Sequence, residues 1–113
     1  IPISGKVGYF QYFRGKFVQA YKSIASSENE QTVIGIENDQ IKIVVKQIAG
    51  ILARRIVCHI REGFSVEKGE RFGMIKFGSR IDMILPNDVD IIVNVGDKVK
   101  GGETVIAKIS PDE

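Results

Sequence analysis

Gly78-Ser79 interrupts a run of strand-forming residues and is the pair in this sequence with the clearest route to covalent chemistry. The stretch GMIKFGSRIDMILP, residues 73–86, reads as a strand that stops at Gly78-Ser79-Arg80 and then resumes. A glycine and a small hydroxyl residue weaken strand packing, so one interpretation is a bulge or kink. The other interpretation is reactive. Glycine permits a strained bend in which the Ser79 hydroxyl attacks the carbonyl carbon of Gly78, converting the amide into an ester.

Such an ester has a defined outcome. β-Elimination would release the upstream chain as a carboxylate and leave a dehydroalanine, whose hydrolysis gives a pyruvoyl group at position 79. A ketone placed there does what pyridoxal does, because it condenses with a substrate amine and accepts the electrons of a departing carboxylate. No G-x-S-x-G elbow surrounds Ser79, so a serine hydrolase is not indicated. The residues alone leave the bulge and the self-cleavage both open.

Composition describes an ordinary globular chain. Its 113 residues predict one domain, 43% are hydrophobic, 27% are charged, and the net charge is +2, which indicates no nucleic-acid partner. Residues 1–60 carry eight Lys and Arg against four Asp and Glu, a bias that suits either a phospholipid surface or scattered solubilising charge. The single cysteine, Cys58, excludes an internal disulfide and suits a reducing compartment. No apolar run approaches the roughly 20 residues of a membrane-spanning helix.

Strand signals dominate the chain. Asn and Asp at 38–39 favour a tight connection between two β-branched runs, which predicts a hairpin. The polar stretch at 22–31 is poor in strand formers and is interpreted as a loop. The predicted strands are 6–13 and 16–21 around a turn at Arg14-Gly15 and the hairpin of 32–36 and 41–48. Residues 49–60 allow a helical turn, but their β-branched residues favour a bulged strand.

An internal repeat occupies the last fifty residues. Residues 62–75 match residues 95–108 at a spacing of 33, and the matched positions are Gly63 with Gly96, Val66 with Val99, Gly69 with Gly102 and Glu70 with Glu103. The pattern G-x-x-V-x-x-G resembles biotinyl and lipoyl domains, and its glycines are expected to need positive φ. It predicts an all-β, barrel-sandwich-like fold in which each hairpin covers the open edge of the other. A carrier role would need a lysine beside Met or Asp at a hairpin tip, whereas Met74 is followed by Ile75.

Four stretches together resemble the phosphatidylserine decarboxylase family in its short prokaryotic, pyruvoyl-dependent form. They are GKVGYFQYFRGKFVQAY, ASSENEQ, QIAGILARRIV and KGERFGMIKFGSRIDMILP, and GERFGMIKFGSR is the most specific. The resemblance implies autocatalytic cleavage of a proenzyme between Gly78 and Ser79, giving a β chain 1–78 and an α chain 79–113. The implied reaction removes CO2 from phosphatidylserine, or from archaetidylserine, and leaves the ethanolamine phospholipid.

Residue roles follow from that resemblance. Ser79 would be the self-processing nucleophile and the precursor of the pyruvoyl cofactor, and Gly78 would supply the scissile carbonyl. Phe77 and Ile81 are expected to anchor the flanks in the core. Lys76, Phe77 and Arg80 are the candidate substrate-binding residues, the two cations facing the lipid phosphate or serving as plain solubilising charges. No metal ligand set is proposed.

The chain also departs from the family pattern. The resemblance places the processing base in an amino-terminal segment that precedes Ile1 and would be this domain's partner within the proenzyme. His59 matches no family motif position and is interpreted as a partly exposed strand residue, and Cys58-His59 lacks partners for a metal. We therefore expect these 113 residues, a single domain and the carboxy-terminal portion of the proenzyme, to be unprocessed and inactive on their own.

The expected location is the cytoplasmic face of the cell membrane, with peripheral attachment and a soluble isolated domain that could form a homo-oligomer. The aromatics of residues 9–13 are candidates for contact with the lipid interface, although they fit a half-buried strand as well. The alternative function is a non-catalytic β-sandwich binding or carrier module of the biotinyl or lipoyl type.

Overall fold

The computed structural model describes residues 1–15, 29–50, 56–75 and 80–109, and within them every regular element is a β-strand, as predicted. No helix in this part of the chain is long and apolar enough to cross a bilayer. The strands are β1 (Gly5–Phe13), β2 (Gln31–Glu37), β3 (Lys42–Ile48), β4 (Ile56–Cys58), β5 (Ser65–Val66), β6 (Gly73–Ile75), β7 (Arg80–Ile84), β8 (Val89–Ile91) and β9 (Ala107–Ile109).

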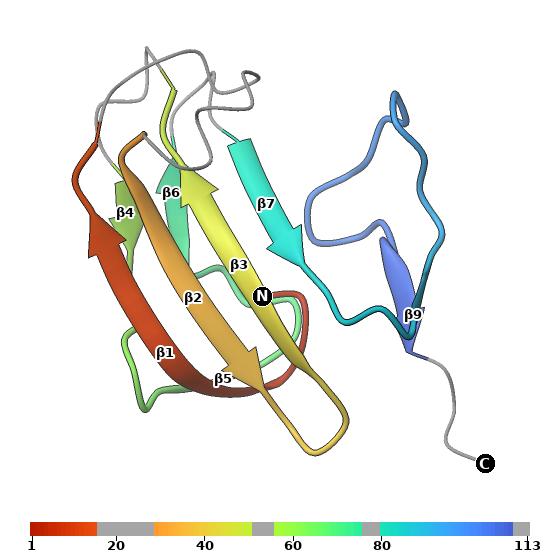
Figure 1. The fold of residues 1–113 in the computed structure, drawn as a ribbon, viewed down its shortest axis with the longest axis horizontal. Coiled ribbons are helices and arrows are strands. Elements are labelled where there is room, and N and C mark those ends of the chain that lie inside the picture. Colours follow the sequence, from red (N-terminus) through yellow and green to blue (C-terminus); the bar gives the residue numbers. More distant parts are fainter. Residues whose placement is uncertain (16–28, 51–55, 76–79, 110–113) are drawn as a thin grey trace.

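The main sheet is antiparallel and has the order β5-β1-β2-β3-β7. It curls, as Figure 1 shows, and the β4–β6 ribbon lies behind it. The β8–β9 ribbon stands to one side of β7 as a separate pair of strands. A curled sheet with a covering ribbon agrees with the predicted barrel-sandwich-like class.

The predicted hairpin is confirmed as β2 and β3. Asn38 organises the connection because its Oδ1 accepts hydrogen bonds from the backbone N–H groups of Gln40 and Ile41, at 2.8 and 3.1 Å. The backbone N–H of Asn38 donates to the Ile41 carbonyl at 3.0 Å, which closes the turn. Side-chain capture of neighbouring backbone donors is the reason that Asn favours such turns.

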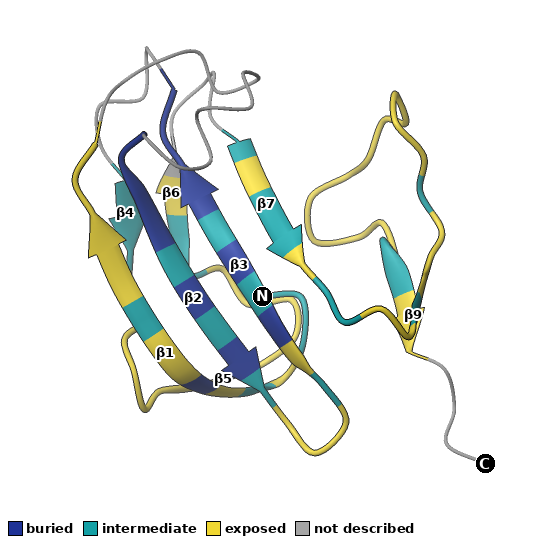
Figure 2. Ribbon diagram, in the orientation of Figure 1, coloured by how far each residue is buried: buried dark blue, intermediate teal, exposed yellow. Residues whose placement is uncertain are grey.

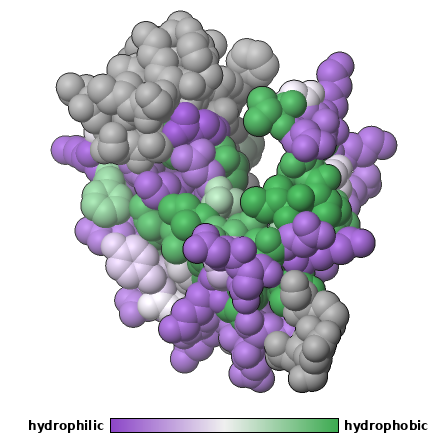
Figure 3. Space-filling model, turned by 45° about the vertical axis from the view of Figure 1, so that its right-hand side comes forward, coloured by the Kyte–Doolittle hydropathy of each residue, from purple (hydrophilic) through white to green (hydrophobic). Residues whose placement is uncertain are grey.

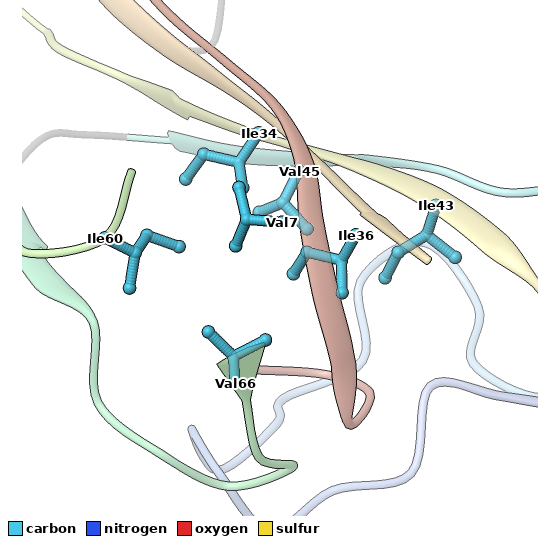
Figure 4. Packing of buried hydrophobic residues seen from close by; sticks show 7 residues of the cluster. All are labelled: Val7, Ile34, Ile36, Ile43, Val45, Ile60 and Val66. Carbon is cyan, nitrogen blue, oxygen red and sulfur yellow. The ribbon is translucent and has the colours of Figure 1, made fainter. Parts of the chain in front are cut away.

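The core lies on the concave side of the sheet. Alternate residues of β2 and β3 point inward, and Figure 2 shows the buried positions concentrated on these two strands. Burying one such branched side chain stabilises the fold by about 1.5–3 kcal/mol relative to leaving it exposed. Figure 4 shows the cluster, which consists of Val7, Ile34, Ile36, Ile43, Val45, Ile60 and Val66.

The two repeats, called copy one (residues 62–71) and copy two (residues 95–104), contain the predicted glycine turns. Among the described glycines, the four with positive φ are Gly63, Gly69, Gly96 and Gly102, with φ of 92°, 88°, 94° and 78°. Each glycine is the third residue of a four-residue turn closed by a backbone hydrogen bond of 3.0–3.1 Å. The prediction drawn from the glycine spacing is therefore confirmed at all four positions.

Other secondary-structure predictions are only partly tested or partly confirmed. The predicted strand at 16–21 and residues 51–55 of the predicted bulged strand lie outside the described residues, while residues 56–58 are the strand β4. The predicted loop ends earlier than expected, because Gln31 opens β2 and Asn29 and Glu30 are buried.

Candidate functional site at the polar end of the sheet

The inward rows of the sheet change from apolar to polar toward one end. On β2 the row runs Ile36, Ile34, Thr32, and on β3 it runs Ile43, Val45, Gln47, all of them buried. This polar end is where the arrowheads of β1 and β3 lie in Figure 1. Polar groups removed from water must be hydrogen-bonded to avoid a desolvation cost of about 1–3 kcal/mol each, so their clustering at one place needs an explanation.

Thr32 and Gln47 satisfy each other across the β2–β3 pair. They are directly opposed in the register, and the Thr32 hydroxyl donates to Gln47 Oε1 at 2.7 Å. Gln47 Nε2 then donates to the Val57 carbonyl at 3.4 Å, which links the sheet to β4. Thr32 is 1% exposed and Gln47 is 2% exposed, so the two side chains form a buried polar pair at this end of the sheet.

The segment that leads into β2 adds further polar groups. Asn29 Nδ2 donates to the Ala49 carbonyl at 2.6 Å, and the Ala49 N–H donates to the Glu30 carbonyl at 3.0 Å. Gln31 Nε2 donates to the Asn29 carbonyl at 3.2 Å. These bonds hold the start of β2 against the end of β3.

Glu30 is the buried carboxyl group of this end. The Tyr12 hydroxyl donates to Glu30 Oε1, while Glu30 Oε2 is buried and has no hydrogen-bond partner among the residues that the structure describes. Removal from water raises the pKa of Glu30 above its ordinary value, because burial penalises the charged form. A carboxyl group in this state retains a proton more readily than an exposed one.

The strand β7 begins at this same end. Arg80 opposes Ile48 and Ile48 opposes Gln31, so β7 begins level with the start of β2, with β3 between the two strands. The Arg80 guanidinium forms a two-point ion pair with Asp82, with Nε to Oδ1 at 2.8 Å and Nη2 to Oδ2 at 3.1 Å. A phosphate would have to compete with or join that carboxylate, so the prediction that Arg80 binds substrate remains a prediction.

The other predicted site residues fall differently. Lys76, Phe77, Gly78 and Ser79 lie outside the described residues. The expectation that Ile81 anchors the junction in the core is wrong, since its side chain is 52% exposed. The reason is topological: β7 is the edge of the main sheet, so its inward row is covered from one side only.

Two further expectations concern His59 and the aromatic stretch. His59 follows β4 and is exposed, with its backbone N–H donating to the Phe72 carbonyl at 2.6 Å. In the stretch 9–13, Phe10 packs against the core whereas Tyr9, Tyr12 and Phe13 are 40–47% exposed. The strand is thus half-buried, and its exposed aromatics remain candidates for an interface.

Sequence reasoning did not single out Tyr12, Glu30, Thr32 or Gln47 as a group. A signal was present, because Thr32 and Gln47 occupy inward positions of strands whose other inward residues are Ile and Val. A polar residue in an apolar row is the informative exception in a buried strand. Their meeting at one end, however, depends on the antiparallel register.

Comparison with known proteins gives one consistent result. The family model described as phosphatidylserine decarboxylase matches residues 1–107. Proteins called phosphatidylserine decarboxylase proenzyme are similar over nearly the whole chain: that of Prosthecochloris aestuarii is 50% identical over 109 residues, and that of a Wolbachia from Brugia malayi is 52% identical over 113. The Chlorobium limicola protein is 46% identical over 108 residues.

These matches cover 96–99% of the present chain but only 49–51% of each relative. The chain therefore spans about half the length of the curated relatives that it matches. No solved structure is detectably similar.

Proposed function

The chain belongs to the phosphatidylserine decarboxylase family, and on that premise we propose that it carries the self-cleaving junction and pyruvoyl precursor of a lipid decarboxylase. The proposed reaction of the whole enzyme is loss of CO2 from phosphatidylserine, or from its ether-lipid equivalent archaetidylserine. The product is the corresponding ethanolamine phospholipid.

The self-cleavage begins with the Ser79 hydroxyl. Its oxygen forms a bond to the Gly78 carbonyl carbon as the Gly78–Ser79 C–N bond breaks, and the freed amine takes up a proton. Removal of the Ser79 α-proton then expels Gly78 as a carboxylate, and water replaces the nitrogen, releasing ammonia and leaving a ketone at position 79. Once formed, that ketone supplies the electron-accepting group that decarboxylation requires.

The observation that carries the proposal is the position of Arg80. Ser79 is covalently bound to Arg80, and consecutive Cα atoms are about 3.8 Å apart. Arg80, the residue that follows Ser79, opposes Ile48 at the polar end of the sheet, and this supports assigning the junction to that end. A polar, desolvated setting is where a developing carboxylate and a charged headgroup are held with least competition from water.

The remaining roles are assigned on the same basis. Lys76, Phe77 and Arg80 are proposed to contact the substrate, with the cations directed to the phosphate. The base for self-processing is assigned to the amino-terminal part of the proenzyme. His59 is not assigned this role, because it is exposed and follows β4 in the β4–β6 ribbon. Residues 1–78 and 79–113 would form the two chains of one domain, attached peripherally to the cytoplasmic face of the membrane.

The proposal is tested by Ser79→Ala in the whole proenzyme. We expect the variant to remain one chain by intact mass and to release no CO2 from phosphatidylserine vesicles. Ser65→Ala is the matched control, because Ser65 is an exposed serine in β5, and this variant should cleave and turn over normally. Decarboxylation by an uncut Ser79→Ala protein would overturn the proposal and favour the non-catalytic module.

A second measurement concerns the 113-residue chain by itself. Without the proposed base it should give a single mass near 12.5 kDa that does not react with borohydride or hydroxylamine. The processed whole enzyme should lose activity with the same reagents. Spontaneous division of the isolated chain after Gly78 would show that the base lies within these residues.

A further inference from the structure

We infer that copy two is an open docking edge for an extended strand, supplied by the part of the proenzyme that these 113 residues do not match. Copy one shows how such an edge is filled, because the same chain provides its covering strand. The inference goes beyond the proposed function: it depends on the family and on the length of its members, not on the chemistry at Ser79.

Copy one is held at its first turn by β1. The Val7 N–H donates to the Phe64 carbonyl at 2.8 Å, and the Gly63 N–H donates to the Val7 carbonyl at 2.8 Å. The pairing continues through β5, where Val66 opposes Gly5. Val66 is consequently 4% exposed and points toward Val7 and the rest of the core cluster (Figure 4).

The second turn of copy one is held by the residues that precede β1. The Gly69 N–H donates to the Ile1 carbonyl at 2.8 Å, and the Ile1 nitrogen donates to the Glu70 carbonyl at 2.7 Å. The Lys68 N–H donates to Ser4 Oγ at 2.8 Å. Residues 1–7 thus bond to copy one at both of its turns.

Copy two has the same turns, but no described segment lies along it as residues 1–7 lie along copy one. Its backbone bonds within the described residues are local: the Asp97 N–H reaches the Asn94 carbonyl at 3.0 Å, and the Glu103 and Thr104 N–H groups reach the Lys100 carbonyl at 3.1 and 3.0 Å. In the described part of the chain, no segment outside copy two bonds to Gly96 or Gly102, whose counterparts Gly63 and Gly69 bond to residues 7 and 1.

The apolar side chains of copy two are correspondingly uncovered. Val99, the counterpart of Val66, is 52% exposed, and Val95 is fully exposed. Figure 3 shows hydrophobic surface reaching the outside of the molecule on the side where the β8–β9 ribbon comes forward. A buried apolar position in one copy and an exposed one in the other, on the same backbone turns, indicates a missing cover.

The occupant follows from copy one. It is an extended segment with a branched apolar side chain at the place of Val7, where it can contact Val99 and bond to Gly96. Residues 1–7 are already engaged on copy one, so they are not available within the same molecule. The relatives contain about as many residues again as this chain matches, and that remainder is the source to which we assign the strand.

Amide hydrogen exchange with NMR detection tests this assignment by comparing Gly63 with Gly96, and Gly69 with Gly102. In the 113-residue chain, the copy-two amides should exchange roughly 100-fold faster than their copy-one counterparts. In the whole proenzyme the exchange rates of the copy-two and copy-one amides should differ by about 10-fold or less. A larger difference that persists in the whole proenzyme, or copy-two amides already protected in a monomeric isolated chain, overturns the inference.

Val99→Asp provides a second readout, with Val66→Asp as the matched control. In the isolated chain only the control should lower the melting temperature, whereas in the whole proenzyme both should lower it by about 5 °C or more. A neutral Val99→Asp in the whole proenzyme contradicts the inference. Concentration-dependent dimerisation of the isolated chain that Val99→Asp abolishes would assign the edge to a second copy, and would also overturn it. A loss of self-cleavage through Ser79→Ala leaves these folding readouts unchanged, so the two proposals can fail separately.

Discussion

Copy one and copy two have the same glycine turns but different surroundings. Both place glycine at positive φ in turns closed by hydrogen bonds of 3.0–3.1 Å. Yet Val66 in copy one is 4% exposed and Val99 in copy two is 52% exposed. The difference arises outside the repeats, because residues 1–7 run along copy one and no described segment does the same for copy two.

The comparison separates two sources of stability. A turn depends on the φ preference of one residue and on one local hydrogen bond, so equal sequences give equal turns. Burial of a valine depends on atoms that another segment supplies, and it contributes about 1.5–3 kcal/mol only when they are present. Comparing the two copies therefore measures how much stability the covering segment contributes by burying the valine.

The largest effect is expected where β1 approaches β2 beside copy one. A Cβ on Gly5 would lie 2.2 Å from the Glu37 carbonyl oxygen, so Gly5→Ala should lower the free energy of unfolding by about 2 kcal/mol or more. Gly101→Ala is the control from copy two, since a Cβ there meets nothing within 4 Å. Urea denaturation of both variants measures the contrast. Equal stability of the two would mean that β1 does not approach Glu37 of β2 as closely as the structure indicates.

Truncation of the paired valines should give the next largest effect. Val66→Ala removes buried methyl groups and should destabilise the isolated chain by about 1–2 kcal/mol. Val99→Ala should change stability by about 0.5 kcal/mol or less, as is usual for exposed positions. Thermal and urea unfolding report both values, and similar losses at the two sites would remove the distinction between the copies.

Alanine substitution of the turn glycines should have the same local cost in both copies. No atom lies within 4 Å of a Cβ built on Gly63 or Gly96, so alanine at either position is penalised by its positive φ alone, by about 1 kcal/mol. In copy one this loss should appear in global unfolding. In copy two it should appear as roughly fivefold faster exchange of the Asp97 amide, which closes the local turn. A global loss from Gly96→Ala would show that copy two is coupled to the sheet.

The smallest effect is expected from Glu30, at the end of the sheet remote from copy one. Burial raises its folded pKa above 4.5, so the folded state binds this proton more tightly than the unfolded state. Its contribution is therefore complete below the unfolded pKa and declines as pH rises through the window between the unfolded and folded values. Glu30→Gln keeps an acceptor for Tyr12 and removes the titration.

Urea denaturation from about pH 4 to pH 8 measures this difference. The Glu30→Gln variant should match the parent in acid and equal or exceed it at neutral pH, with both repeats unaffected. A variant that is weaker than the parent only at neutral pH would indicate that the folded state stabilises the charged carboxylate.

Much of this protein could be predicted from local patterns. The hairpin follows from β-branched runs on either side of Asn38, whose side chain captures two backbone donors. The four positive-φ glycines follow from their spacing. The family resemblance, now supported by a match over residues 1–107, was carried by contiguous motifs. Each of these features depends on residues close together in the chain.

Other features were decided only when distant segments met. The exposure of Ile81 follows from the place of β7 at the edge of the sheet, which no property of residue 81 reveals. The polar end exists because an antiparallel register sets Thr32 against Gln47 and Ile48 against Arg80. The unequal fates of Val66 and Val99 depend on which copy residues 1–7 reach. Turn geometry and strand propensity are set by neighbouring residues, whereas burial is set by contacts between segments far apart in the chain, and only the tertiary structure determines those.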